Sequence, residues 1–146
     1  MSELTVGQAA KSAGVPVEVL RELCEAQKVP ARKGERGHWY LQAEDIPSPG
    51  WIVEAVRAQY REDVANAQEA MARFTREVEA VQLDLNEAAE DAAGHGRLGN
   101  DLRSFAAIDS PFERARHSLM RRLLDVQLTH RQLQALAEHP AQDAGR

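Results

Sequence analysis

The stretch from Trp51 to about Ala93 contains neither proline nor glycine, and it constrains the fold more than any other part of the chain. From Tyr60 onward its apolar residues recur at alternating steps of four and three. This repeat of about 3.5 residues is typical of a coiled-coil seam. A helix of this length, roughly 60 Å at 1.5 Å per residue, is too long to bury its apolar stripe inside a small globule. We therefore expect a partner helix, from the same chain or from another.

The residues of the predicted seam lie on this helix and on a second helix near the C-terminus, and we expect the chain to self-associate through them. They are Tyr60, Val64, Met71, Phe74, Val78, Val81, Leu85, Leu119, Leu123 and Val126. Between Val53 and Val64 the steps are three, four and four, a spacing that locally unwinds a left-handed supercoil. Whether the helices pair within or between chains stays open.

Charge is distributed unevenly over the 146 residues, which suffice for one or two small domains. Residues 1–50 carry six basic against seven acidic residues, residues 51–94 four against ten, and residues 95–146 eight against six. The net charge of −5 therefore arises in the long helix.

The single cysteine, Cys24, excludes an internal disulfide, and its place between Leu23 and Glu25 favours a small core residue over a reactive thiol. No apolar run approaches the roughly 20 residues that span a membrane. The N-terminus also lacks a basic region followed by an apolar core. We expect a cytoplasmic protein without membrane contact.

Two short helices are predicted at the N-terminus. Thr5 and Gln8 form a Thr-x-x-Gln capping box for the first helix, and Gly14 ends it. The second helix starts near Pro16. Proline lacks the backbone N–H, but it is tolerated in a first helical turn because the N–H groups there have no helical partner. Two short helices joined by a glycine-containing turn are a helix-turn-helix candidate.

A small hairpin is predicted next, with extended segments at Val29–Arg32 and His38–Leu41 around residues 33–37. The two glycines between the segments permit the positive φ that such a turn needs. A helical turn is expected at Ala43–Ile46, and Pro47–Gly50 is expected to be a domain boundary. This order of elements predicts a winged helix-turn-helix in residues 1–46, which we call the head.

The head resembles the winged helix-turn-helix of MerR and excisionase-type proteins. The resemblance rests on Leu4–Ala10, Ala13–Val15, Val19–Arg21, Val29–Ala31, Gly37–Tyr40 and Glu44–Ile46. It implies a second helix that enters the major groove of duplex DNA, a wing that contacts the DNA backbone, and a long dimerisation helix. This chain has Pro16 where those families usually cap the second helix with Ser or Thr, and it lacks the C-terminal cysteines of the metal-sensing members.

Basic residues of the head are the candidates for contact with double-stranded DNA: Lys11, Arg21, Lys28, Arg32, Lys33, Arg36 and His38. In the expected fold Arg21 reaches a base edge, while the wing residues hold phosphates. Glu18, Glu22 and Glu25 share the second helix and repel phosphate unless they are paired. Trp39 and Tyr40 are expected to anchor the wing to the helices.

Neither a metal site nor a catalytic site is predicted. The five histidines are scattered without ligand spacing, and the carboxylates of the long helix are spread along a solvated face. We expect no cofactor and no enzymatic activity.

Beyond the long helix, glycines at 94, 96 and 99 predict a turn, and a short helix is expected near Leu102–Ile108. Ser110 as cap, Pro111 as first helical residue and Glu113 predict the start of another helix. Its apolar stripe is broader than a two-stranded seam requires, which allows for a protein partner as well.

The sequence thus predicts a mainly α protein with a small β-hairpin wing. Its expected parts are the head at 1–46, a linker at 47–50, the long coiled-coil helix at 51–93, a glycine-rich turn at 94–100, C-terminal helices at 101–139 and a disordered tail at 140–146. A small DNA-binding transcriptional regulator acting as a dimer or higher oligomer is favoured. The alternatives are a phage DNA-packaging protein that resembles small terminase subunits and forms a ring, and an adaptor that binds proteins rather than DNA.

Overall fold

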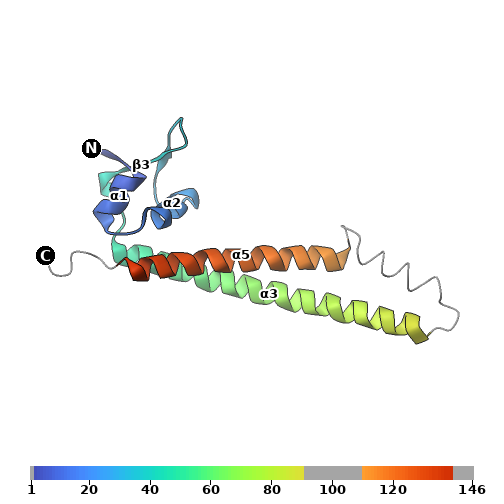
Figure 1. The fold of residues 1–146 in the computed structure, drawn as a ribbon. Coiled ribbons are helices and arrows are strands. Elements are labelled where there is room, and N and C mark those ends of the chain that lie inside the picture. The colour runs from blue at the N-terminus through green and yellow to red at the C-terminus, as the bar shows by residue number, and fades with distance from the viewer. Residues whose placement is uncertain (1, 91–109, 140–146) are drawn as a thin grey trace. The chain divides into compact units, whose positions relative to one another are not determined.

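The computed structural model of the chain describes residues 2–90 and 110–139, which are mainly helical with a small antiparallel sheet near the N-terminus (Figure 1). Its contacts divide the chain into two compact units. The N-terminal unit comprises Met1–Tyr60 and Leu128–Arg146, and the hairpin unit comprises Arg61–Gln127. The predicted glycine-rich turn, the short helix after it and the C-terminal tail lie outside the described residues.

Helix α1 (Val6–Ala13) begins at the predicted capping box. Thr5 Oγ1 accepts a hydrogen bond from the Gln8 N–H at 3.2 Å, and the Thr5 N–H donates to Gln8 Oε1 at 3.0 Å. The helix ends at Gly14, as predicted, with a φ of 70° in the left-handed region that favours glycine.

Helix α2 (Val17–Glu25) starts at Pro16 without a side-chain cap. Its end was not predicted, because a non-glycine residue, Gln27, takes a left-handed φ of 57° there. This conformation lets the Lys28 N–H donate to the Leu23 carbonyl at 3.0 Å, which satisfies one of the last free carbonyls of the helix.

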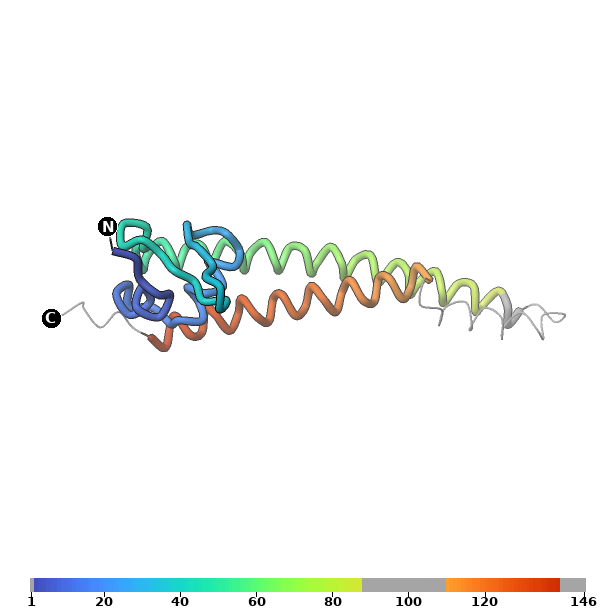
Figure 2. The backbone as a smooth tube through the Cα atoms, turned by 90° about the horizontal axis from the view of Figure 1, so that it is seen from above, coloured from blue at the N-terminus to red at the C-terminus, as the bar shows by residue number. Residues whose placement is uncertain are grey.

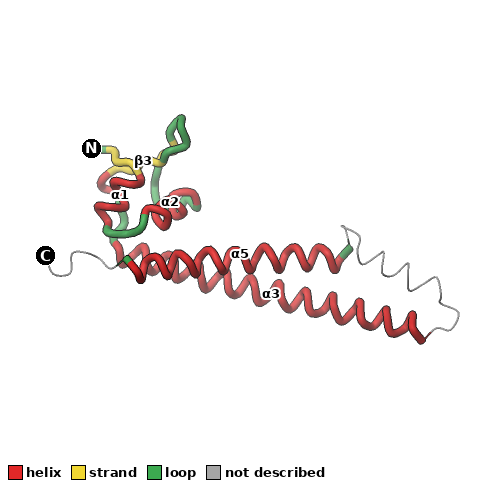
Figure 3. Tube along the Cα trace, viewed as in Figure 1, coloured by secondary structure: helices red, strands yellow, loops and turns green. Residues whose placement is uncertain are grey.

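The sheet has three antiparallel strands in the order β1-β3-β2 (Figure 3). The strands are β1 (Glu3–Thr5), β2 (Arg32–Lys33) and β3 (Trp39–Gln42). In the central pairing Leu4 lies opposite Leu41, which is buried in the core. The sheet therefore joins the start of the chain to the predicted hairpin.

The strands differ from the prediction in their number and in their bounds. Strand β1 was not predicted, and β2 begins only at Arg32 rather than at Val29. Pro30 has no N–H to donate to a sheet, which explains why the segment before Arg32 does not pair. The helical turn predicted near Ala43–Ile46 is present as a 3₁₀ turn at Ala43–Asp45.

Helix α3 (Pro49–Glu90) starts within the predicted linker at 47–50, so that part of the linker is corrected to helix. Ser48 caps the helix, since its Oγ accepts a hydrogen bond from the Trp51 N–H at 3.2 Å. Pro49 follows as the first helical residue, a position in which its missing N–H costs nothing.

The core of the N-terminal unit extends past the expected boundary. Ile52 and Val56 of α3 are fully buried together with Leu20 and Leu41 of the head. Leu133, Ala135 and Leu136 of α5 (Pro111–Glu138) are partly buried against the same core. The chain thus divides at Tyr60, and the first turns of α3 belong to the same unit as the head.

In the hairpin unit α3 and α5 lie side by side and antiparallel, as both Figure 1 and Figure 2 show. Helix α5 begins at the predicted cap, where Ser110 Oγ accepts a hydrogen bond from the Glu113 N–H at 3.1 Å. The rings of Phe74 and Phe112 pack with their centroids 5.5 Å apart. Helix pairing within one chain is therefore observed in this unit.

The predicted seam residues of the hairpin unit differ in burial, and their part in self-association stays a prediction. The buried positions of α3 are Asp63, Ala67 and Ala70, whereas Met71 and Val78 are 46% and 38% exposed. On α5, Ala115 and Leu119 are buried and Leu123 is exposed. Alanine side chains are small and let α3 and α5 approach closely. The alanines of α3 are therefore buried in the contact, while larger seam residues such as Met71 lie beside it. Within the described residues no helix is long and apolar enough to cross a membrane.

Candidate nucleic-acid interface

The hairpin between β2 and β3 has a tight tip built on two glycines. The Gly34 N–H donates to the His38 carbonyl at 2.7 Å, and the Gly37 N–H donates to the Gly34 carbonyl at 2.9 Å. Gly37 has a φ of 78°. A Cβ on Gly34 would lie 2.7 Å from Tyr40 Cε2, so that glycine leaves room for the aromatic ring. The tip holds the predicted wing cations at a defined place.

The exposed cations of this tip are Lys33 and Arg36, and His38 is exposed beside them. Lys33 Nζ lies 5.7 Å from the centroid of the Trp39 ring, a favourable contact of a cation with an aromatic face. Arg36 and His38 form no side-chain hydrogen bond or ion pair with any other described residue. Their donors are therefore available to a ligand.

Two predicted DNA-contact residues are instead held by the protein. Arg32 donates from Nε and Nη2 to the two carboxylate oxygens of Glu3, each at 3.0 Å, and its guanidinium lies 4.9 Å from the centroid of the Tyr40 ring. Because β3 lies between β1 and β2, this pair links the two edge strands of the sheet. Lys28 Nζ donates to Gln59 Oε1 of α3. These partners are 29 and 31 positions away in sequence, and short-range patterns could not reveal them.

Helix α2 presents a mixed face to solvent. Arg21 is exposed and forms no ion pair with the described residues, while Glu18 and Glu25 are exposed beside it and Glu22 is half-buried. The carboxylates lower the attraction of this face for phosphate.

Lys11 lies in the last turn of α1 and is exposed. A cation at this position interacts favourably with the helix C-terminus. Figure 1 shows α2 and the β2–β3 hairpin on the same side of α1. Five of the seven predicted residues are exposed and have neither a side-chain hydrogen bond nor an ion pair among described residues: Lys11, Arg21, Lys33, Arg36 and His38.

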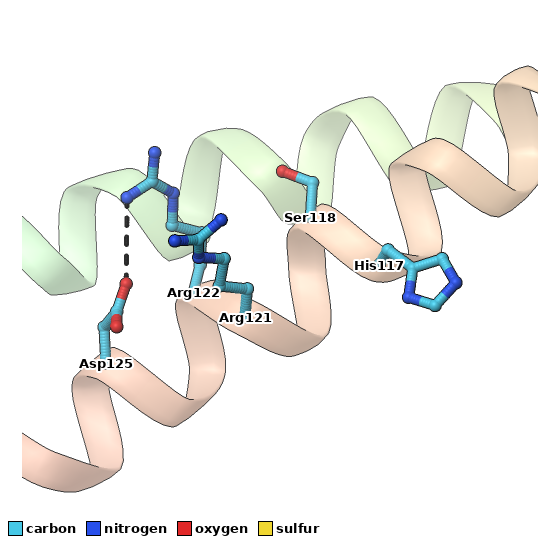
Figure 4. A pocket seen from close by; sticks show the side chains of 5 residues that line it. All are labelled: His117, Ser118, Arg121, Arg122 and Asp125. Carbon is cyan, nitrogen blue, oxygen red and sulfur yellow. Dashed lines mark ion pairs between the residues drawn. The ribbon is translucent and has the colours of Figure 1, made fainter.

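A separate shallow polar surface lies along α5 in the hairpin unit, where sequence reasoning placed no site. Figure 4 shows its lining residues, His117, Ser118, Arg121, Arg122 and Asp125. Arg122 forms an ion pair with Asp125 at 3.7 Å. All five belong to one helix face, so the surface is open rather than an enclosed pocket.

No grouping of three or more His, Cys, Asp or Glu side chains that could hold a metal ion occurs within residues 2–90 and 110–139. The chain matches no known protein family, no curated protein and no solved structure. Its function must therefore be argued from its own residues.

Proposed function

We propose that this chain is a DNA-binding protein, a small transcriptional regulator that contacts duplex DNA with its head. The observation that carries the proposal is the set of exposed, unpaired cations at the tip of the β2–β3 hairpin, in the same unit as exposed Arg21. The resemblance of the head to MerR and excisionase-type proteins supports the same assignment.

In this proposal the cations have different tasks. Lys33 and Arg36 hold phosphate oxygens and fix the position of the head on the duplex. Arg21 donates to a base edge in the major groove, where a bidentate arginine contact favours guanine. Arg32 contributes less than predicted from the sequence, because Glu3 already compensates its charge.

A second candidate function is a protein-interaction adaptor, and one observation favours it. The solvent face of α2 carries Glu18 and Glu25 around Arg21, and this acidic character suits a basic protein partner better than phosphate. The two candidates differ in a measurable way, since only the first requires affinity for duplex DNA.

The test is fluorescence-anisotropy binding of the full chain to a labelled random duplex at low salt. The double variant Arg21→Glu and Arg36→Glu should weaken binding by more than about tenfold, because two attractive charges become repulsive. Arg76→Glu is the control, since it reverses one charge in the same way on an exposed residue of α3 in the hairpin unit.

Unchanged affinity in the double variant would contradict the proposal, and so would an equal loss in Arg76→Glu. Circular dichroism of each variant checks that helix content is retained. If the unmodified chain binds no duplex at low salt but retains a protein partner, the adaptor is favoured instead.

A further inference from the structure

An apolar flank runs along α3 in the hairpin unit beside its contact with α5. Val64, Met71 and Val78 follow one another at seven-residue spacing, so they lie on nearly one line of the helix. Met71 and Val78 are exposed, and Val64 is half-buried. Gln68 and Thr75, which carry no charge, lie next to this line. The flank is therefore a largely exposed line of apolar side chains bordered by uncharged polar residues.

Helix α5 contributes exposed apolar residues to the same side of the pair. Glu69 of α3 and Ser118 of α5 line one shallow hollow. This hollow marks the side of the helix pair that lies opposite the apolar flank. Each directly precedes a buried residue, Ala70 or Leu119. Each residue of a helix is rotated by about 100° about the helix axis from the residue before it. When two helices pack antiparallel, the residue that follows a buried position therefore lies on the same side of the pair in both helices. Met71 and Met120 therefore share the side away from the hollow.

We call this surface the apolar strip, and it comprises Val64, Met71, Val78, Phe112, Met120 and Leu123. Met120 and Leu123 are 52% and 47% exposed. Arg116 lies within the strip, but its charge is compensated by Glu113 at 2.9 Å. Several exposed apolar side chains on one side of a helix pair, bordered by polar residues, are typical of an interaction site.

We propose that the apolar strip is covered by the apolar strip of a second copy of this chain. The distribution of charge on α3 and α5 favours a second copy of the chain as the partner of the strip and favours one orientation of that copy. Residues 61–90 of α3 carry three basic against eight acidic residues, whereas residues 111–127 of α5 carry four basic against two acidic. Two copies of α3 repel each other at packing distance, while α3 of one copy attracts α5 of the other.

The charges therefore favour a twofold axis parallel to the helices. In that arrangement each α3 packs against the α5 of the other copy, every neighbouring pair is antiparallel, and four helices share one apolar centre. The alternative twofold axis, across the helices, would place α3 against α3. This inference goes beyond the proposed function, because the association needs no DNA.

Sedimentation equilibrium of the full chain without DNA tests the interface. We expect a dimer, and the double variant Met71→Glu and Leu123→Glu should weaken dimerisation by more than about a hundredfold, because it buries unpaired charges. Leu83→Glu is the matched control on an exposed residue of α3 outside the strip, and it should leave the dimer intact. Circular dichroism checks that both variants remain helical.

A monomeric unmodified chain, a ring of eight to twelve copies, or a dimer that survives the double variant would each overturn the proposal. The orientation is tested by disulfide cross-linking of Val64→Cys with Leu123→Cys, which lie on opposite helices of the strip. A cross-linked dimer that forms only after the two single variants are mixed and exchange subunits supports the proposed axis. Cross-linking of Val64→Cys to itself overturns it.

Discussion

Arg32, a predicted phosphate contact in the wing, is already engaged by other residues of the fold. Its position in the wing predicted a phosphate contact, yet it donates two hydrogen bonds to Glu3 and stacks on Tyr40. An exposed ion pair of this kind stabilises the fold by no more than about 1 kcal/mol. Arg36 lacks such a partner among the described residues and remains the stronger candidate.

Cys24 is buried, as predicted from its neighbours, and burial raises the pKa of its thiol, with the nearby charge of Glu25 as a smaller cause. The folded state therefore keeps the thiol proton at pH values where the unfolded chain loses it. Below about pH 8.5, the ordinary thiol pKa, the group adds no pH dependence, and above it the free energy of unfolding falls as pH rises.

Denaturant unfolding of the chain and of Cys24→Ala between pH 7 and pH 10 measures this effect. The difference in unfolding free energy between the two proteins should be constant near neutral pH and should shrink at alkaline pH. A difference that stays constant over the whole range would contradict the assignment. The comparison with Cys24→Ala removes the contribution of lysines and tyrosines that titrate in the same range.

Local signals correctly predicted where several helices begin and end. The Thr5–Gln8 box, the stop at Gly14 and the Ser110 cap all act within a few residues, so the sequence carries them directly. The start of α3 had the same kind of signal, because Ser48-Pro49 repeats the Ser110-Pro111 pattern. The nearby Gly50 and Pro47 suggested a linker instead, and that prediction was wrong for Pro49 and Gly50.

The rotation of α3 could not be predicted from its own residues. The predicted repeat includes Ala67, which is buried, and Phe74, which packs on Phe112, but it does not include the buried Ala70, and Met71 and Val78 of the repeat are exposed. Which line of a helix is buried depends on the shape of the neighbour, here Phe112 and Leu119 of α5. A pattern read along one helix cannot contain that information.

Substitution by alanine should change the stability of the chain in opposite directions at Gly14 and at Gly50. Gly14→Ala should destabilise the chain by about 1 kcal/mol, because alanine resists the left-handed φ of 70° although space is available. Gly50→Ala should stabilise it by about 0.5 kcal/mol, because Gly50 is helical and a Cβ there meets no other atom within 4 Å. Urea denaturation followed by circular dichroism measures both changes, and equal signs would contradict these assignments.

At the scale of the whole molecule the two units have different surfaces. The N-terminal unit carries the exposed cations proposed to contact DNA, whereas the hairpin unit carries the acidic part of α3 and the apolar strip. The net charge of −5 therefore says little about DNA affinity, because binding depends on where the cations lie. The proposed association of two hairpin units would bring two heads into one particle and couple their binding.

The most direct test of the proposed function is the salt dependence of duplex binding by the full chain. Between about 50 mM and 200 mM salt, the logarithm of affinity should fall linearly with the logarithm of salt concentration, with a slope near −0.9 for each phosphate contacted. We expect measurable binding at the lower salt concentration and such a slope. Absence of binding at low salt, or an affinity that does not change with salt, would contradict it.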